Sequence, residues 1–416
     1  MRHLTTSAAA LIMSATPVFA ADLPVAPEPV DYVQICDAYG NGYYFIPGTD
    51  TCLRIRGRVR AEYRFNDFGD EPSNWTDRLL NDTSTRARGY LRMDARTQTE
   101  YGLLRAYIDM FATIDSGSPT SISSLPDGVD EGYSSDPSTS FTLDYAFVQF
   151  GGMTVGKTHS FYDFWTGYAY GAINTVAYSD QTLWLAGYTF DLGNGLSASV
   201  SVEDATYRRQ SLISEDLDSL TTIGYGGHRA PDLVGNLRLD QGWGSAQLMA
   251  AVHEVRYAES YPSGKAGWAI GAGVEVNLPF LTNTQFALMG NYAQGALGYV
   301  HSDWNDRMYD AGEVEGGNDG LADGWSIATG IYTELTPEWN FALQGSYADA
   351  DQELVYDIAQ WDVVGKVGWT PVHGFEIGGE VAYRNLNYDE DAASLITETP
   401  DDTDIVTALI RVQRDF

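Results

Sequence analysis

The stretch LRIRGRVRAEYRF, from Leu53 to Phe65, decides the fold, because apolar or small residues alternate with charged ones through it without a break. Successive side chains of a β-strand point to opposite faces, so Arg54, Arg56, Arg58 and the charged residues after them share one face. So many like charges on one strand indicate a confined aqueous lumen. The alternation therefore predicts an outer-membrane β-barrel whose basic face lines the channel.

The same alternation recurs along the chain, with connections that switch between short and long. Sixteen strands are expected: Leu53–Phe65, Arg86–Gln98, Leu104–Ala112, Phe141–Phe150, Met153–Lys157, Leu183–Phe190, Leu196–Glu203, Leu233–Asp240, Ser245–Arg256, Trp268–Leu278, Gln285–Gln294, Trp325–Leu335, Trp339–Asp349, Gln360–Thr370, Phe375–Asn385 and Ile405–Phe416. An even number of strands, with both ends on one side, is typical of bacterial barrels. We therefore expect an all-β fold, a 16-stranded antiparallel transmembrane barrel with an infolded constriction loop.

The N-terminal region indicates export to the outer membrane. Arg2 and His3 precede an apolar stretch, and small residues end at Ala20, which predicts a signal peptide over residues 1–20. Residues 21–51 would form a periplasmic, plug-like segment and residues 52–416 the barrel. After the signal peptide, no uninterrupted apolar run reaches the roughly 18 residues that a membrane-spanning helix needs.

Charge and cysteine content limit the partners and the compartment. The chain has 57 acidic and 24 basic residues, a net charge of -33, which argues against nucleic acid as a partner. The two cysteines, Cys36 and Cys52, would meet an oxidising periplasm, so we expect a disulfide between them. Two free thiols are the alternative.

The basic face predicts where the channel is narrowest. Middle positions of the strands should lie nearest the constriction, and acids on a long infolded loop would oppose the arginines across the lumen. The predicted constriction residues are Arg58, Arg60, Arg88, Arg92, Asp109, Asp163 and Asp180. Alternatively, the arginines pair with Glu62, Asp94 and Asp109 to pack the wall.

Several segments resemble the general porins of alphaproteobacteria. They are VQICDAYG (Val33–Gly40), IPGTDTCL (Ile46–Leu53), LDYAFVQF (Leu143–Phe150), GKTHSFYDF (Gly156–Phe164), PDLVGNLR (Pro231–Arg238) and RVQRDF (Arg411–Phe416). The resemblance implies a sixteen-stranded, trimeric, water-filled channel. It also implies that the third long loop, here Thr158 to Thr182, folds into the barrel and narrows it.

Chemical motifs give no sign of catalysis. The histidines form no metal-ligand pair at helical spacing, and neither a Gly-x-Ser-x-Gly motif nor a phosphate loop occurs. We therefore expect no enzyme, no metal and no cofactor. A barrel esterase with Ser and His on adjacent strands stays open as an alternative.

The sequence thus predicts an outer-membrane porin for passive diffusion of small hydrophilic solutes and ions. Its expected partners are outer-membrane lipid, lipopolysaccharide and further copies of the chain in a homotrimer. A substrate-selective channel is one alternative, in which loop aromatics such as Phe161, Tyr162 and Trp165 line the path; anchoring the loop is the role we favour for them. A structural or adhesive barrel acting through its acidic surface loops is the other.

Overall fold

The structure is a computed structural model of the chain. It describes residues 34–71, 73–117, 120–122, 132–134, 137–216, 219–258, 264–279, 283–302, 304, 308–314, 320–352, 355–389 and 400–416. The predicted signal peptide and residues 21–33 lie outside the described residues. Within the described ranges, no helix is long and apolar enough to cross a membrane.

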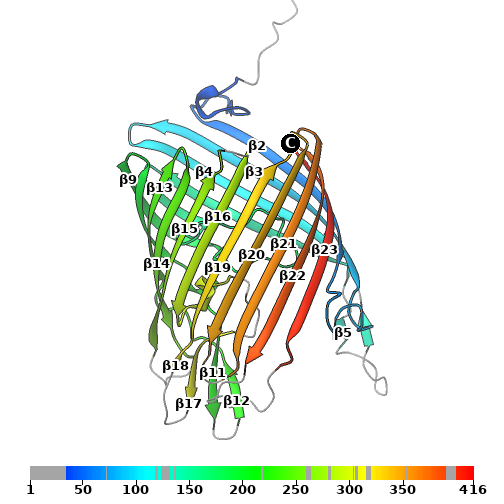
Figure 1. Cartoon of the computed structure of the whole chain (residues 1–416). Coiled ribbons are helices and arrows are strands. Elements are labelled where there is room, and N and C mark those ends of the chain that lie inside the picture. The colour runs from blue at the N-terminus through cyan, green and yellow to red at the C-terminus, as the bar shows by residue number, and fades with distance from the viewer. Residues whose placement is uncertain are drawn as a thin grey trace, which may run out of the picture.

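A closed antiparallel barrel of sixteen strands forms the body of the molecule (Figure 1). The strands are β2 (Cys52–Phe65), β3 (Thr83–Thr99), β4 (Gly102–Asp115), β7 (Ser138–Phe150), β8 (Met153–His159), β9 (Thr182–Gly193), β10 (Leu196–Glu203), β13 (Asp232–Gln241), β14 (Gly244–Val255), β15 (Lys265–Asn277), β16 (Thr284–Gln294), β19 (Asp323–Glu334), β20 (Trp339–Asp351), β21 (Asp357–Val372), β22 (Phe375–Asp389) and β23 (Thr403–Asp415). The barrel closes where β2 pairs with β23, with Arg58 opposite Asp415. Each of the expected segments overlaps one of these strands, so the predicted barrel is confirmed.

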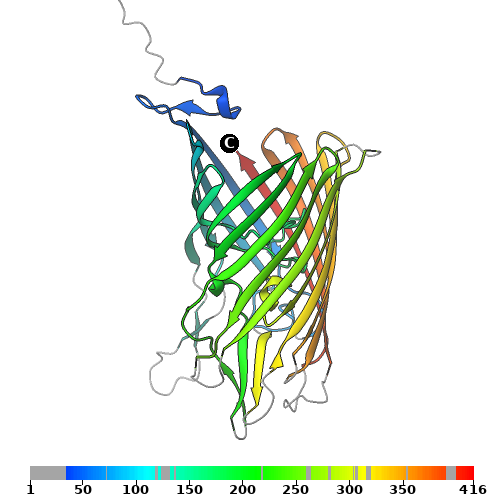
Figure 2. The same cartoon turned by 90° about the vertical axis from the view of Figure 1, so that its left-hand side faces the viewer.

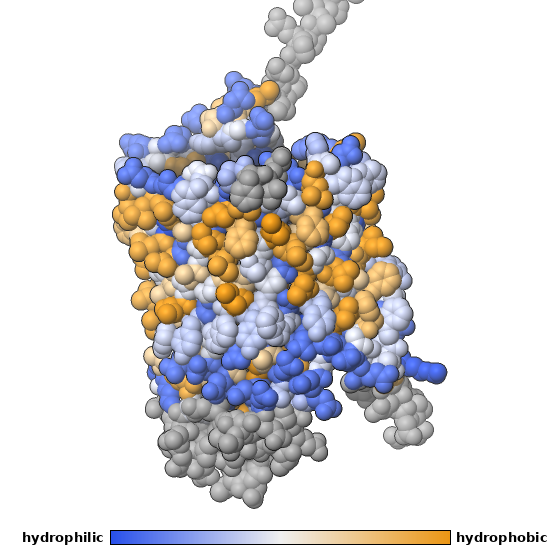
Figure 3. Space-filling model, in the orientation of Figure 1, coloured by the Kyte–Doolittle hydropathy of each residue, from blue (hydrophilic) through white to orange (hydrophobic). Residues whose placement is uncertain are grey.

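The alternation in sequence becomes an apolar outside and a polar inside. On β2, Ile55, Val59 and Tyr63 are 49%, 55% and 45% exposed, whereas Glu62 between them is buried. Figure 3 shows the apolar residues as a band on the visible wall, bounded by hydrophilic residues towards both rims. Such a band is what the hydrocarbon core of a bilayer requires.

The two rims of the barrel differ. The C-terminus and the short turns lie at the upper rim in Figures 1 and 2, and the long connections lie at the opposite rim. Short turns are periplasmic in barrels of this kind, so the long connections face the exterior. They carry two small sheets, β5 (Thr120–Ile122) with β6 (Gly132–Ser134), and β11 (Ser211–Asp216) with β12 (Ser219–Ile223), β17 (Tyr309–Val314) and β18 (Gly320–Leu321).

A small lobe precedes the first barrel strand, beyond the periplasmic rim (Figure 2). It contains η1 (Asp37–Tyr39) and β1 (Tyr44–Phe45), which pairs with the start of β2. Cys36 is bonded to Cys52, with 6.0 Å between their Cα atoms, so the predicted disulfide is confirmed. Tyr43, which is buried, donates a hydrogen bond to Asp94 on β3 at 2.8 Å. The lobe is therefore fixed to the barrel by a covalent bond and a buried hydrogen bond.

Candidate pore constriction

The infolded loop, residues 160–181 between β8 and β9, follows the inner wall around much of the barrel. Near its start, Phe161 donates its backbone N–H to Glu203 Oε1 on β10 at 2.9 Å. Further along, the N–H groups of Tyr168 and Ala169 reach Gln344 Oε1 on β20 at 2.8 and 3.0 Å. Beyond them, the side-chain amide of Asn174 donates a hydrogen bond to the Thr407 hydroxyl on β23 at 3.4 Å. The wall therefore supplies acceptors for backbone N–H groups that leave regular structure.

Inward-facing glycines provide the seats for this loop. A Cβ atom on Gly273 of β15 would lie 2.3 Å from the ring of Phe164, and one on Gly330 of β19 would lie 2.5 Å from Trp165. On β22, a Cβ atom at Gly378 would lie 2.1 Å from the Tyr170 hydroxyl. Real Cβ contacts of that length do not occur, so only glycine lets these aromatic groups lie directly on the wall.

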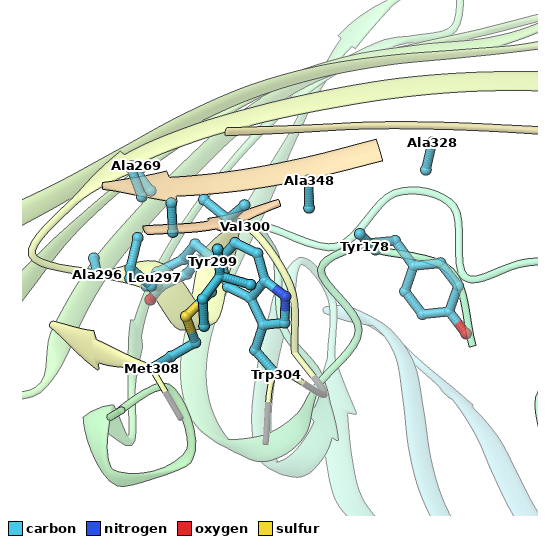
Figure 4. Packing of buried hydrophobic residues seen from close by; sticks show 14 of the residues in the cluster. Tyr178, Ala269, Ala296, Leu297, Tyr299, Val300, Trp304, Met308, Ala328 and Ala348 are labelled. Carbon is cyan, nitrogen blue, oxygen red and sulfur yellow. The ribbon is translucent and has the colours of Figure 1, made fainter. Parts of the chain in front are cut away.

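Two external connections close over the infolded loop from the other side. The 204–231 loop follows β10 and contains η2 (Ala205–Tyr207), and the 295–322 loop follows β16 and contains η3 (Leu297–Tyr299). Figure 4 shows Leu297, Tyr299, Trp304 and Met308 of the 295–322 loop packed together near small wall residues such as Ala269. These residues and the infolded loop form one buried hydrophobic cluster, so loops fill part of the lumen.

Arg208 joins the three loops. Its guanidinium is fully buried and donates to Asp163 Oδ1 at 2.7 Å and Ser179 Oγ at 2.8 Å, both in the infolded loop. It also donates to the Gly298 carbonyl at 3.0 Å in the 295–322 loop. Burial disfavours the charged guanidinium, but the carboxylate of Asp163 outweighs this and raises the pKa of Arg208. Arg208 therefore stays charged and holds the loops together.

A buried carboxyl group makes a second link between the external connections. Asp310, on β17, accepts hydrogen bonds from Gln210 N at 2.8 Å, Leu297 N at 2.7 Å and the Tyr225 hydroxyl at 2.6 Å. Burial raises the pKa of Asp310, and the hydrogen bonds from these donors, which lower the pKa, offset only part of this effect. The link ties the 204–231 loop to the 295–322 loop.

The arginine wall consists of lumen-facing side chains on β2, β3 and β4. Its members are Arg54, Arg56, Arg58, Arg60, Arg86, Arg88, Arg92 and Arg105. Some are neutralised by carboxylates: Asp94 on β3 contacts Arg54, Arg96 and Arg105 at 3.8, 2.9 and 3.0 Å. Arg86 pairs with Asp115 at 2.5 Å. The alternative that these arginines pack the wall thus describes Arg54, Arg86 and Arg105.

The predicted basic constriction residues have different surroundings. Arg58 pairs with Asp415 at 2.6 Å, beside the C-terminus, and Arg92 pairs with Asp109 at 2.5 Å. Arg60 lies 3.3 Å from Glu62, which it shares with Arg64 and Arg411. Arg88 has no carboxylate partner in the described ranges; it donates to Thr113 Oγ1 at 2.7 Å and lies 4.2 Å from the Phe111 ring centroid. Among the residues that the structure describes, Arg88 therefore has no ion pair of its own, with Asp144 and Asp115 acting on it from further away, and Arg60 has only a share of Glu62.

The two predicted acids of the infolded loop lie at its base. Asp163 has a side chain only 3% exposed and is held by Arg208, so it does not face the lumen, in contrast to the expectation. Asp180 is 31% exposed and lies 3.4 Å from His159. His159, Asp163 and Asp180 present ligand atoms within 4.8 Å of one another, as a metal site would. Because Asp163 already accepts hydrogen bonds from Arg208, Ser179 and Gln181, we assign this cluster to holding the loop.

Sequence reasoning missed the residues that hold the infolded loop. Arg208 lies in a long connection with no strand parity to mark it, and Gln344 is one of many polar residues on inward faces. The glycines of the wall offered one weak indication of where the loop packs. Gly271 and Gly273 occupy inward-facing positions of β15, which normally carry larger side chains.

A closed sixteen-stranded barrel with an apolar outer band and a loop inside defines an outer-membrane channel. Residues 22–409 match the family described as "Porin subfamily", and the chain belongs to this family of porins. The Porin Omp2b of Brucella suis biovar 1 is 31% identical over 395 residues, which cover 92% of each chain. A Brucella suis Porin Omp2b is 31% identical over the whole length of both chains. These relatives confirm the resemblance to alphaproteobacterial general porins.

Solved structures support the fold. The outer-membrane channel DcaP of Acinetobacter baumannii superposes with a TM-score of 0.62 at 14% identity, covering 89% of this chain and 99% of that one. OmpT of Vibrio cholerae superposes with a TM-score of 0.51 at 9% identity over 89% of this chain and 99% of that one. Membership of the porin family and the relatives at 31% identity show that the chain is a porin of the outer membrane, a channel for passive diffusion.

Proposed function

We propose that solutes pass between the infolded loop and the arginine wall, and that this passage favours anions. One observation carries the proposal. The hydrogen bonds of the infolded loop described above go to β10, β20 and β23; the last of these strands is the neighbour of β2, but none of these bonds goes to β2, β3 or β4. Space in the lumen is therefore bounded on its other side by the arginines.

The charge of the narrowest part supports anion preference. On the loop side, Glu380 accepts the N–H of Tyr170 and Glu376 accepts its hydroxyl, so the wall carboxylates there are covered by the loop. Across the passage, Arg56 is exposed, and among the described residues no carboxylate forms an ion pair with Arg88, although Asp144 and Asp115 act on it from further away. Fixed charge of one sign beside a narrow aqueous path favours ions of the other sign. We propose that Arg60, Arg88 and Arg92 lie at the constriction, and that Arg58, between them in the strand register, is neutralised there by Asp415.

We further propose that the working unit is a homotrimer in lipid and lipopolysaccharide, and that the chain has no catalytic activity. Membership of the porin family supports both statements. Small hydrophilic solutes would be its cargo, with size set by the infolded loop.

Single-channel recording in planar bilayers tests the proposal. Under a KCl gradient around 1 M, where exposed surface charge is strongly screened, we expect stepwise currents and a reversal potential of the sign for anion preference. Arg60→Gln/Arg88→Gln should shift the reversal potential towards cations. Arg238→Gln is the matched control, because this arginine lies on β13 beside Asp240. A cation-preferring wild type, or equal shifts in both variants, would contradict the proposed passage.

A further inference from the structure

The register of β2 and β3 puts like charges face to face. Arg56 lies opposite Arg92, and Arg60 lies opposite Arg88. Directly opposed like charges destabilise an antiparallel pair. Elsewhere on the same two strands the pairing is complementary, since Arg54 opposes Asp94 and Glu62 opposes Arg86. The two arginine pairs are therefore an exception within their own ladder.

One tyrosine lies at the centre of these pairs. Tyr90, opposite Arg58, has its ring centroid 5.2 Å from the guanidinium carbon of Arg60, 5.9 Å from that of Arg88 and 5.4 Å from that of Arg92. The Tyr90 hydroxyl accepts a hydrogen bond from Arg88 at 3.2 Å. Aromatic faces hold guanidinium groups by cation–π attraction and leave the N–H edges available to other acceptors. Tyr90 thus gathers three cations whose donors can converge on a ligand.

The carboxylates nearby do not balance this charge. Asp109 pairs with Arg92, and Glu62, the neighbour of Arg60, is also contacted by Arg64 and Arg411. The buried Nε of Arg60 lies 3.3 Å from Glu62 Oε1 and makes no well-aligned hydrogen bond with it. The four guanidinium groups of the two opposed pairs therefore face Asp109, a share of Glu62, and Asp144, which acts on Arg88 without forming an ion pair with it.

We infer that Arg56, Arg60, Arg88 and Arg92 form a binding subsite for a compact, doubly charged tetrahedral oxyanion, inorganic phosphate or the phosphate group of a small phosphomonoester. The inference rests on the proposed passage along the arginine wall. Planar guanidinium groups bind phosphate through paired N–H···O bonds. A dianion also relieves both like-charge pairs at once, whereas a single chloride ion offers half the charge and no second acceptor atom.

Blocking of chloride current by phosphate tests the subsite. At pH 8, constant ionic strength and in planar bilayers, phosphate should reduce the single-channel chloride current in a saturable way, whereas acetate should not. Glycerol phosphate is the second probe. Block by both compounds would assign the site to phosphomonoesters as well as the free ion, and block by phosphate alone would restrict it to the free ion.

Substitutions locate the site. Arg60→Gln and Arg88→Gln should each raise the phosphate concentration for half block at least tenfold, while Arg238→Gln should leave it within twofold. Arg88→Lys keeps the charge but loses the paired donors, so its phosphate concentration for half block should lie between those of wild type and Arg88→Gln. All variants should show the heat-dependent shift in gel mobility of a folded barrel.

The outcomes separate this inference from the proposed function. A conducting, anion-preferring channel on which phosphate acts no more than acetate would overturn the subsite and leave the passage intact. Equal phosphate block in Arg60→Gln and wild type would do the same. A channel that does not conduct, or prefers cations, would remove the proposed passage itself.

Discussion

At the scale of single residues, Arg208 is the most consequential side chain outside the arginine wall. Its replacement by Met would leave the carboxylate of Asp163 buried without its cation. Breaking a buried ion pair from one side costs about 3–5 kcal/mol. We expect Arg208→Met to loosen the infolded loop, seen as faster proteolysis at residues 160–181 and noisier single-channel current. The folded barrel should persist, because the loop contributes no strand to it.

Two further variants make this prediction specific. Arg229→Met is the matched control, because Arg229 lies in the same connection but has an exposed side chain beside Glu254, and exposed pairs contribute about 0–1 kcal/mol. Arg208→Met/Asp163→Asn removes both charges and should recover part of the protease resistance. Resistance of Arg208→Met equal to that of wild type would show that the loop does not depend on the ion pair.

A second residue makes the external loops sensitive to acid. His301, in the 295–322 loop, is fully buried; its Nε2 lies 3.1 Å from the Gln360 amide nitrogen, so it accepts a hydrogen bond there as a neutral ring. Burial, reinforced by the Arg384 cation, holds the pKa of His301 well below its usual value. Below about pH 6.5 the unfolded loop therefore binds a proton that the folded loop refuses, and stability falls by up to about 1.4 kcal/mol per pH unit.

The pH dependence of amide exchange measures this effect. Protection factors of residues 297–302, corrected for intrinsic exchange, should fall from pH 7 to pH 5 in wild type. In His301→Gln the fall should be smaller, because the titrating group is gone. The same slope in both proteins would assign the acid sensitivity to another group.

At the scale of elements, the infolded loop depends on the absence of side chains beneath it. Gly273→Leu would push against the Phe164 ring, and overpacking of this kind costs about 1–3 kcal/mol. We expect the loop to shift into the passage or away from it, so that single-channel conductance changes and its variance grows. Gly365→Leu is the control, because a Cβ atom added at Gly365 would have no neighbouring atom within 4 Å. This variant should have the conductance of wild type. Phe164→Ala should restore a single conductance level to Gly273→Leu if the contact is the cause.

The strands could be predicted from sequence, and the route of the infolded loop could not. Strand parity is local: Ile55 and Arg56 point to opposite faces because of the pleat alone, so neighbouring residues suffice to find it. The position of Tyr168 depends on Gln344, which lies 176 residues further along the chain. Likewise the burial of Asp163 is decided by Arg208, 45 residues away. Such contacts follow from how the barrel closes, which no local pattern encodes.

At the scale of the whole molecule, two sets of charges act at different distances. The chain carries a net charge of -33, and described acids such as Asp70, Glu71 and Asp402 are exposed in the external connections. The arginines of the wall lie inside the lumen, within contact distance of a passing ion. The Debye length falls from about 10 Å at 0.1 M salt to about 3 Å at 1 M. Salt should therefore suppress the influence of the mouth more than that of the arginine wall.

This difference predicts that anion preference increases with salt, which is the reverse of an ordinary charged pore. At 0.1 M, the acidic residues at the external mouth concentrate cations and offset the anion preference of the arginine wall. At 1 M, the charges at the mouth are screened, so that only charges in contact with the passing ion affect selectivity. The trend is measured by reversal potentials at one fixed ratio of salt concentrations across the bilayer, repeated at mean concentrations from 0.1 to about 1 M. The variant Arg60→Gln/Arg88→Gln should instead prefer cations at low salt and lose this preference as the salt concentration rises. A wild-type preference that weakens steadily with salt would mean that the mouth and the wall do not act as separate filters.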